Sequence, residues 1–346
     1  MNLSKLLFVF VCVSTLLISQ AFAFYNGQSA SLVIGQPDFT SSGPELDENE
    51  NEIISASGLS SPYYVAFDSS GNLWVADRNN NRILRYSTPF TNGEAATLVI
   101  GQPDFISNGG GTTDSTLSSP QAITFDSSGN LWVVDRGNNR VLRFETPSNG
   151  EAATLVIGQP NFESSDPNTG GGGGAADADG LDFPLGIAFD SSGNLWVTDR
   201  NNNRILRYST PFANYEEASL VIGQRDFESS NSNTDENGEG DNISASGLDS
   251  PRGIAFDSSG NLWVVDRNND RVLRFPVSSI ENGDNGDGGA ADLVIGQSDF
   301  TSNGEGTSAS TFDGPYGIAF DSSGNLWVSD DDPNNNDNSR VLRFDT

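Results

Sequence analysis

The stretch Phe-Asp-Ser-Ser-Gly-Asn-Leu-Trp-Val at residues 67–75 occurs five times in this chain of 346 residues. The other copies begin at residues 125, 189, 256 and 320, and the spacings between successive tryptophans are 58, 64, 67 and 64 residues. The five tryptophans of the chain all occupy this one position: Trp74, Trp132, Trp196, Trp263 and Trp327. Repetition on this scale predicts an array of equivalent structural units.

One unit can be divided into strands and turns. Residues 186–189 form a short apolar run that follows Pro184, and residues 190–194 read as a tight turn in which Gly193 takes a positive φ. Apolar runs at 195–197, 205–208 and 218–222 predict three further strands. The last run carries a second repeated motif, Leu-Val-Ile-Gly-Gln.

Four short antiparallel strands, repeated around an axis, make a propeller blade. We name the strands a, b, c and d from the axis outward. The motif Leu-Val-Ile-Gly-Gln at residue 32 precedes the first complete unit, and the fifth unit stops after its strand c at residues 341–344. The sequence therefore predicts an all-β fold, a five-bladed β-propeller of four-stranded antiparallel blades. We expect residues 32–34 to pair with the last blade and close the ring.

The motifs of each unit are similar to those of a known repeat. Pro-x-Gly-Ile-Ala-Phe-Asp, Gly-Asn-Leu-Trp-Val-x-Asp and Asn-x-Arg-Val-Leu-Arg-Phe together resemble the NHL repeat over residues 31–346. The family often forms six blades and usually has His before the Arg, where this chain has Asn or Asp, and the fifth unit has an insertion at residues 331–338. The resemblance implies a propeller that acts as a scaffold for partners, and it says little about activity.

The N-terminus has the features of an export signal. A positive start, an apolar run at residues 6–18 and a small-residue site ending at Ala23 predict a signal peptide at residues 1–23, cleaved after Ala23. Residues 24–346 then form the propeller, and we expect a secreted or periplasmic location. The apolar run is shorter than the roughly 20 residues that span a bilayer, so no membrane insertion is expected.

Composition restricts the function. The formal net charge is −30, with 47 carboxylates and no His, and the only Lys and the only Cys lie within the predicted signal peptide. An acidic field of this size disfavours nucleic-acid partners. Without His, Lys or Cys in residues 24–346, triad catalysis, Schiff-base chemistry and thiol chemistry are excluded.

Each unit also repeats an acidic and a basic residue five positions apart, loosely so in the last unit. A pair that serves every blade is expected to be structural, with the Arg reaching a carboxylate or carbonyl groups across a hairpin. An acid or ligand cluster is the alternative interpretation. The pairs are Asp77 and Arg82, Asp135 and Arg140, Asp199 and Arg204, and Asp266 and Arg271.

The two faces of the propeller differ in sequence. The b–c loops and the d–a segments should emerge on one face, which carries all the long and varied loops, whereas the a–b turns on the other face are identical. The loop-rich face includes Arg78, Arg136, Arg200 and Arg267. The residue after the strand-a proline also varies from unit to unit, with tyrosine in both the first and the fifth, and these residues should surround the mouth of the central channel: Tyr63, Gln121, Leu185, Arg252 and Tyr316.

These observations predict a binding module with an unknown protein or glycan partner and a monomeric state. The five channel-mouth residues are the expected ligand site, although sequence drift at a tolerant position would also explain their variety. A carboxylate- or metal-dependent hydrolase or lyase in the channel, similar to lactonases, is the alternative. No cofactor, catalytic residue or specific metal site is predicted. The spacing at residues 266–270 matches a calcium loop poorly, and the acidic inserts would at most hold Ca²⁺ loosely.

Overall fold

The structure is a computed structural model that describes residues 29–43, 52–168, 174–234, 242–281, 289–331 and 339–346. The predicted signal peptide and most of the acidic inserts lie outside the described residues. The chain divides into one unit at Met1–Leu32 and a second at Val33–Thr346. The fold described below is that of the second unit.

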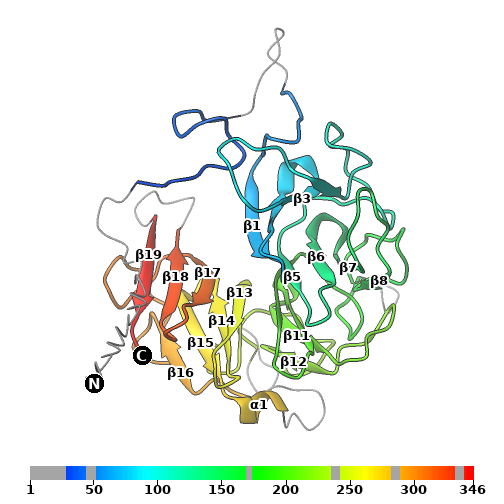
Figure 1. The fold of residues 1–346 in the computed structure, drawn as a ribbon. Helices are drawn as coiled ribbons and strands as arrows, with labels where there is room; N and C mark the ends of the chain where they lie inside the picture. The colour runs from blue at the N-terminus through cyan, green and yellow to red at the C-terminus, as the bar shows by residue number, and fades with distance from the viewer. Residues whose placement is uncertain (1–28, 44–51, 169–173, 235–241, 282–288, 332–338) are drawn as a thin grey trace, which may run out of the picture. The chain divides into compact units, whose positions relative to one another are not determined.

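Five antiparallel sheets follow one another along the chain, and Figure 1 shows them arranged around a common centre. The innermost strands of neighbouring sheets contact one another. This arrangement confirms the predicted five-bladed β-propeller. Blade 1 contains β1 (Pro62–Phe67), β2 (Leu73–Asp77), β3 (Arg82–Tyr86) and β4 (Leu98–Ile100). Blade 2 contains β5 (Ile123–Phe125), β6 (Leu131–Asp135), β7 (Arg140–Phe144) and β8 (Leu155–Ile157).

The remaining blades have the same order from the centre outward. Blade 3 contains β9 (Pro184–Phe189), β10 (Leu195–Asp199), β11 (Arg204–Tyr208) and β12 (Leu220–Ile222). Blade 4 contains β13 (Pro251–Phe256), β14 (Leu262–Asp266), β15 (Arg271–Phe275) and β16 (Leu293–Ile295). Blade 5 contains β17 (Pro315–Phe320), β18 (Leu326–Asp330) and β19 (Arg340–Phe344).

The a–b turn explains the repeated stretch that begins at residue 67. One oxygen of the Asp68 side chain accepts hydrogen bonds from the backbone N–H groups of Ser70 and Asn72, at 2.9 and 3.0 Å. The other oxygen accepts from the Asn72 amide and from the indole N–H of Trp74, both at 2.9 Å. Gly71 takes the φ of 79° that closes the turn. The same bonds recur in every blade, so the a–b turns are uniform structural turns. The c–d connections, which emerge on the same face, are 10–17 residues long and vary, so the prediction that all long and varied loops lie on the other face is wrong.

Each tryptophan joins its blade to the next one. The ring of Trp74 meets Phe125 of blade 2 edge-on, with the ring centroids 5.6 Å apart. Trp132 and Phe189, Trp196 and Phe256, and Trp263 and Phe320 repeat this contact with centroid distances of 5.6–5.7 Å. Edge-to-face aromatic pairs of this kind add to the free energy gained by burial.

The motif Leu-Val-Ile-Gly-Gln fixes the outer strand of a blade. The Gln102 amide donates to the carbonyl oxygens of Asn81, at 3.0 Å, and Gly109, at 2.8 Å. Gly101 has a φ of 86°, and a Cβ atom there would lie 2.5 Å from the Leu117 side chain. The glutamine of the motif therefore holds the outer strand against the b–c loop of its own blade. The glycine before it is required because its backbone conformation and the close Leu117 side chain leave no room for a Cβ atom.

Blade 5 differs from the prediction. Its sheet contains three strands, and no described residue at 32–34 belongs to a strand, so the predicted pairing that closes the ring is not present. Val33 still contacts blade 1 in the way that Val99 of strand d contacts blade 2: its N–H donates to the Asn92 side chain at 2.9 Å and its carbonyl accepts from Gly93, as Val99 does with Asn149 and Gly150. Trp327 and Phe67, which would meet in a closed ring, are 38% and 60% exposed. In Figure 1 the ribbons of β19 and β1 stand apart.

Helical structure is short. Among the described residues, one α-helix, α1 (Val277–Glu281), lies between strands c and d of blade 4, and single 3-10 turns follow strand b in blades 1–4. None of the helices in the described part of the chain has both the length and the apolar character that a bilayer crossing needs.

The b–c loop of blade 4 contains a carboxylate where the other blades have an amide. In blade 1, the Asn81 side chain accepts from Ser119 N–H and donates to Asn108 O, at 2.7 and 2.8 Å. Asp270 keeps only the first kind of bond, to Gly314 N–H at 2.8 Å. Burial, followed by repulsion from nearby acids that include Asp313, raises the pKa of Asp270 to about 6.

We expect Asp270→Asn to stabilise the protein at pH 7.5. Because the folded-state pKa lies above the unfolded value of 3.8, the folded state holds the proton more tightly, and stability is lost as the pH rises through about 6. Allowing for partial exposure, the gain should be about 1–2 kcal/mol. Unfolding at pH 7.5 and pH 4.5 tests this, with Asn203→Asp as the reverse change. An equal gain at both pH values would contradict the explanation.

Candidate ligand-binding site at the channel mouth

The five residues that differ between blades line one cavity of about 380 Å³ at the centre of the propeller: Tyr63, Gln121, Leu185, Arg252 and Tyr316. All five stand directly after the proline at, or just before, the start of the innermost strand of their blade. The structure thus brings the predicted channel-mouth residues together. Their role in ligand binding stays a prediction.

Tyr316 connects three blades. Its hydroxyl donates to the Tyr63 hydroxyl at 3.1 Å and accepts from the Gln121 amide at 3.3 Å. The rings of Tyr316 and Tyr63 lie 5.9 Å apart and are tilted by 56°. Burial, together with the hydrogen bond to Tyr63, raises the pKa of Tyr316. The phenol therefore stays protonated at neutral pH and keeps its donor.

Five arginines lie over three aromatic rings around this mouth. Four of them are the predicted loop-face residues, each of which opens a 3-10 turn after strand b, and the fifth is Arg252. Guanidinium groups over aromatic faces form cation–π contacts. The contacts, measured to the ring centroid, are Arg78 to Tyr63 at 4.8 Å, Arg136 and Arg200 to Phe183 at 4.3 and 5.3 Å, and Arg252 and Arg267 to Tyr316 at 4.3 and 5.9 Å.

Phe183 is a member of the site that the sequence analysis missed. It precedes Pro184 and has a φ of 56°, in the left-handed region that a bulky residue rarely adopts. The equivalent positions in the other blades hold small residues, which are Ser61, Ser119, Ser250 and Gly314. The sequence feature that could have identified it is that blade 3 has Phe at a position where the other blades have Ser or Gly. The positive φ is shared by Ser61, Ser119, Ser250 and Gly314, so the backbone conformation belongs to the blade and only the phenyl ring is specific to blade 3.

The backbone beside Arg252 is held by blade 3. The Thr198 hydroxyl donates to the Arg252 carbonyl oxygen at 2.8 Å. A Cβ atom on Gly186 would lie 2.4 Å from the same oxygen. The glycine after the variable residue therefore allows neighbouring inner strands to approach closely and places the Arg252 side chain at the mouth.

Gly186→Ala is accordingly expected to destabilise the fold by about 2–3 kcal/mol, because the methyl group overlaps backbone rather than a flexible side chain. Urea denaturation measures this change. Gly109→Ala is the matched control, since a Cβ atom there meets nothing within 4 Å. A loss at Gly186 no larger than that at Gly109 would show that the inner strands do not pack this closely.

The environment of the arginines is unfavourable for positive charge. Burial, and then repulsion from Arg78 and Arg200, lowers the pKa of Arg136. Burial, opposed in part by Tyr316 and reinforced by Arg267 and Arg200, lowers the pKa of Arg252 to about 10. Both groups remain charged at neutral pH. The arginines therefore repel one another within a common site.

The wall of the cavity below the mouth is apolar. Val65, Ile187, Ile254 and Ile318 come from four different inner strands. No carboxylate occurs among the described residues that line the cavity. The described part of the site is therefore suited to an apolar group with a polar or charged end at the mouth.

The Asp–Arg pairs lie away from the channel and hold the blade together. Arg82 Nε donates to Asp77 at 2.8 Å, and the rest of its guanidinium donates to carbonyl groups of Ser55, Gly58 and Phe105. Both side chains of each full pair are completely buried, and the fifth pair, Asp330 and Arg340, is partly exposed. The other pairs are Asp135 and Arg140, Asp199 and Arg204, and Asp266 and Arg271.

These pairs leave little capacity for metal. One oxygen of Asp266 accepts from Asp249 N–H, and the other accepts from Asn269 and Arg271. Outside the stretches that the structure leaves undescribed, no group of three or more acidic, His or Cys side chains is placed to hold a metal ion. Loose binding of Ca²⁺ by the acidic inserts stays untested, because most of those residues are not described.

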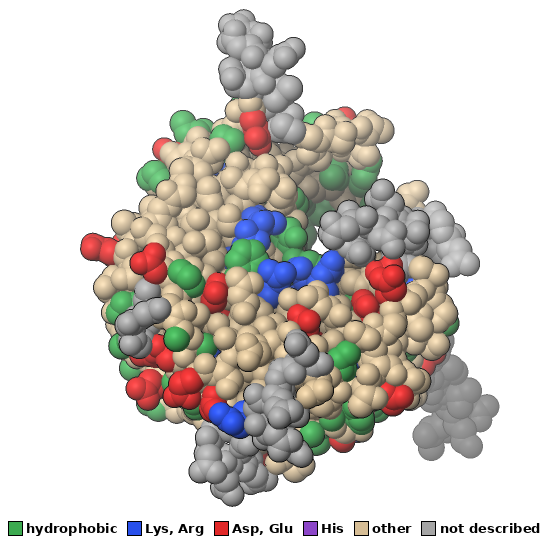
Figure 2. All heavy atoms as spheres, turned by 180° about the vertical axis from the view of Figure 1, so that it is seen from behind, with side chains coloured by type: hydrophobic (Ala, Val, Ile, Leu, Met, Phe, Trp, Pro, Cys, Tyr) green, Lys and Arg blue, Asp and Glu red, His purple; other side chains and the backbone are tan. Residues whose placement is uncertain are grey.

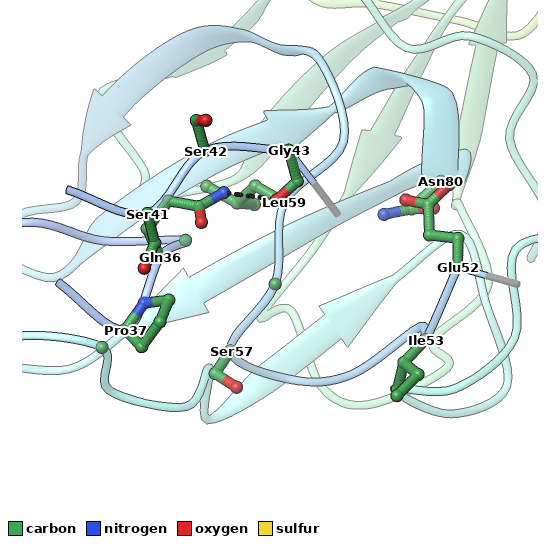
Figure 3. Close-up of a pocket in the computed structure, with 13 residues that line it drawn as sticks. Gln36, Pro37, Ser41, Ser42, Gly43, Glu52, Ile53, Ser57, Leu59 and Asn80 are labelled. Atoms are coloured by element: carbon green, nitrogen blue, oxygen red, sulfur yellow. Dashed lines mark hydrogen bonds between the residues drawn. The ribbon is translucent and has the colours of Figure 1, made fainter. Parts of the chain in front are cut away.

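A second cavity, of about 450 Å³, lies beside the segment that follows Val33 (Figure 3). Figure 3 shows Gln36 directed toward Gly43, whose carbonyl oxygen accepts from the Gln36 amide at 3.1 Å. The equivalent Gln102 binds a second carbonyl, from the b–c loop of its own blade. The cavity thus occupies the place that a b–c loop fills in the other repeats. We attribute it to the absent pairing with blade 5.

Comparisons with known proteins agree with this architecture. The family model of the NHL repeat matches residues 59–86, 117–144, 181–208 and 248–275, which are one stretch in each of blades 1–4. This chain is an NHL-repeat β-propeller. In the fifth unit, which the model does not match, the b–c loop is lengthened by the insertion at residues 331–338. The match covers the blade framework and leaves the channel-mouth function open.

The proteins with similar sequences are distant. Teneurin-4 of Mus musculus is 28% identical over 201 residues, which are 53% of this chain and 7% of that protein. Protein SUPPRESSOR OF QUENCHING 1, chloroplastic, of Arabidopsis thaliana is 22% identical over 228 residues, which are 65% of this chain and 20% of that protein. NHL repeat-containing protein 3 of Homo sapiens is 26% identical over 87 residues, 24% of this chain and 22% of that protein. The chain thus spans less than a quarter of each relative.

Solved structures with similar folds are also propellers of low identity. A nidogen/laminin complex contains a chain with 19% identity and a TM-score of 0.48, covering 87% of this chain and 84% of that chain. Virginiamycin B lyase from Staphylococcus aureus, with quinupristin, has 16% identity and a TM-score of 0.45, covering 82% of this chain and 70% of that chain. At this similarity the likeness concerns the fold alone.

Proposed function

We propose that this propeller is a binding module, and that its ligand is held at the mouth of the central channel on the loop-rich face. The observation that carries the proposal is the convergence of the five blade-specific residues on one cavity. A rigid scaffold that presents different side chains around a common hollow is typical of a ligand site.

The repeats act as an internal control. The Asp of each a–b turn, the Trp, the buried Asp–Arg pair and the Gln after strand d have the same contacts in several blades, and these contacts account for their presence. The position of Tyr63, Arg252 and Tyr316 varies between blades; the two tyrosine hydroxyls are hydrogen-bonded to each other, and Arg252 lies over the Tyr316 ring. Blade architecture alone does not require them.

The setting of the binding module rests on the N-terminal sequence. The signal-like residues 1–23 support export, and the partner would then be a protein, a glycan or a small ligand outside the cytoplasm. The acidic surface supports solubility and disfavours nucleic acid and anionic membranes as partners.

Binding is favoured over the hydrolase or lyase alternative. Carboxylate or carboxylate-metal chemistry needs acidic groups directed at the channel, whereas the described lining of the cavity has none. The enzymes among the structural neighbours share the fold at 16–17% identity, which does not transfer an activity.

A thermal-shift screen of small carboxylates, sugars and short peptides tests the proposal, because ligands of the folded state raise Tm. A compound that binds should lose at least tenfold in affinity to the variant Tyr63→Ala/Arg252→Ala/Tyr316→Ala. The control variant Ser69→Ala/Ser127→Ala/Ser191→Ala changes the a–b turns on the opposite face and should stay within twofold. Unchanged affinity in the first variant would place the site elsewhere, and circular dichroism checks that both variants fold.

A further inference from the structure

The chain contains 16 arginines and one lysine. Eleven of the arginines have clear structural partners. Five pair with the aspartate of their own blade, four of them fully buried and Arg340 partly exposed; they are Arg82, Arg140, Arg204, Arg271 and Arg340. Five lie over the tryptophan of their own blade, which are Arg85, Arg143, Arg207, Arg274 and Arg343. Arg225 pairs with Asp226.

The other five are the arginines at the channel mouth: Arg78, Arg136, Arg200, Arg252 and Arg267. The Nε atoms of the first four are buried and have no hydrogen-bond partner. Among the described residues no carboxylate forms an ion pair with these four. Arg267 is held differently, because it donates to the carbonyl oxygens of Gly314, at 2.7 Å, and Asp331, at 3.3 Å.

This concentration of positive charge is unusual for a protein with a formal net charge of −30. Figure 2 shows most of the basic side chains on this face gathered at the central hollow, with one near the edge, and most of the acidic side chains further out. Like charges that share a half-buried site repel one another, and Arg200 acts on both Arg136 and Arg252. An anion at the mouth would relieve this repulsion, and guanidinium groups form strong charge-assisted hydrogen bonds with anions.

We propose that the ligand of the channel is an amphipathic organic anion. Its carboxylate, sulfate or phosphate group would bind to Arg136, Arg200 and Arg252 at the mouth. Its apolar part would pack on Ile187, Ile254 and Ile318 in the cavity below. The inference rests on the proposed function and gives the chemical class of the ligand.

The shape of the site separates this class from simpler ions. A cavity of about 380 Å³ with an apolar wall offers nothing to a bare inorganic anion. The guanidinium groups of Arg78, Arg136 and Arg252 lie over the rings of Tyr63, Phe183 and Tyr316, at 4.8, 4.3 and 4.3 Å from the ring centroids. A planar acid group accepts from guanidinium edges in pairs.

Isothermal titration calorimetry with the full chain tests the inference. The probes are 1-naphthalenesulfonate and 1-naphthoate, with 1-naphthamide as the neutral analogue and inorganic sulfate as the bare anion. We expect both naphthyl anions to bind at least tenfold more tightly than the amide and the sulfate. Raising NaCl from 50 to 500 mM should weaken the anions only.

Two double variants localise the effect. Arg136→Gln/Arg252→Gln should weaken naphthalenesulfonate binding at least tenfold and change naphthamide binding less than threefold, and Arg136→Lys/Arg252→Lys should restore part of the loss. Arg85→Gln/Arg143→Gln removes the same charge from strands c of blades 1 and 2. The affinity for naphthalenesulfonate should then stay within twofold of the wild-type value. Circular dichroism and Tm confirm that each variant is folded.

Two results would overturn the inference. The first is that the amide or sulfate binds as tightly as the naphthyl anions. The second is that Arg136→Gln/Arg252→Gln leaves the affinity for naphthalenesulfonate unchanged. If the amide binds as tightly as the anions and loses affinity in the Tyr63, Arg252 and Tyr316 triple variant, the anionic class is wrong while the proposed site stands. If no probe responds to any mouth variant, the site itself is contradicted as well.

Discussion

Arg140→Ala is expected to lower the free energy of unfolding by about 3–5 kcal/mol and Tm by roughly 6–10 °C. Arg140 is completely buried, and its guanidinium binds Asp135 at 2.8 Å and carbonyl groups of Thr113, Thr116 and Phe162. Removing it leaves a buried carboxylate and three carbonyl groups without their donor. A buried polar group that loses its hydrogen-bond donor lowers the free energy of unfolding by far more than the intact pair raises it.

The control for this change lies three residues further along the same strand. Arg143 is also cationic, but it is partly exposed, lies over Trp132 and pairs with the exposed Glu145. Arg143→Ala should therefore cost about 1 kcal/mol or less. Guanidinium chloride denaturation compares the two. Similar losses for both variants would mean that the Asp–Arg pair is not the staple of the blade.

Trp132→Ala is expected to lower the free energy of unfolding by about 3–5 kcal/mol. The indole is completely buried between blades 2 and 3, where it meets Phe189 at 5.6 Å and Phe212 at 4.9 Å between ring centroids. Its N–H donates to Asp126. Truncation would leave a cavity at the blade interface and an aspartate without one of its donors.

Trp327→Ala is the matched change at the end of the ring. Trp327 is 38% exposed and keeps only the intrablade bond to Asp321 and the contact with Arg343 among the interactions described. Its loss should cost about 1 kcal/mol. A cost equal to that of Trp132→Ala would contradict the exposed edge, and would show that Trp327 packs against Phe67 to close the ring in solution.

Most of the fold was predictable because each unit repeats the same local rules. The turn at residues 67–75, with Asp68 accepting four hydrogen bonds, and the tryptophan spacing are enough to define the blades. The closure of the ring was not predictable in the same way. Residues 32–34 carry the strand-d motif and Val33 makes the strand-d contact with blade 1, but the pairing with β19 that would complete the ring is absent.

The site was predictable in part. Position after the strand-a proline located Tyr63, Arg252 and Tyr316, because equivalent positions of a propeller meet at its axis. The stacking of Arg136 and Arg200 on Phe183 was not foreseen. It depends on a left-handed backbone conformation at Phe183 and on the distance between neighbouring blades, neither of which is encoded by residue type alone.

The most direct test of binding at the loop-rich face uses single cysteines. In a Cys12→Ser background the chain has no other cysteine, so Asn79→Cys, beside Arg78, and Ser128→Cys, in an a–b turn, each give one reactive thiol. The strongest ligand of the thermal-shift screen is added, and the rate of alkylation by bromobimane is measured. We predict at least tenfold protection of the thiol at residue 79 and none at residue 128. Equal protection at both, or protection at residue 128 alone, would contradict binding at the channel mouth.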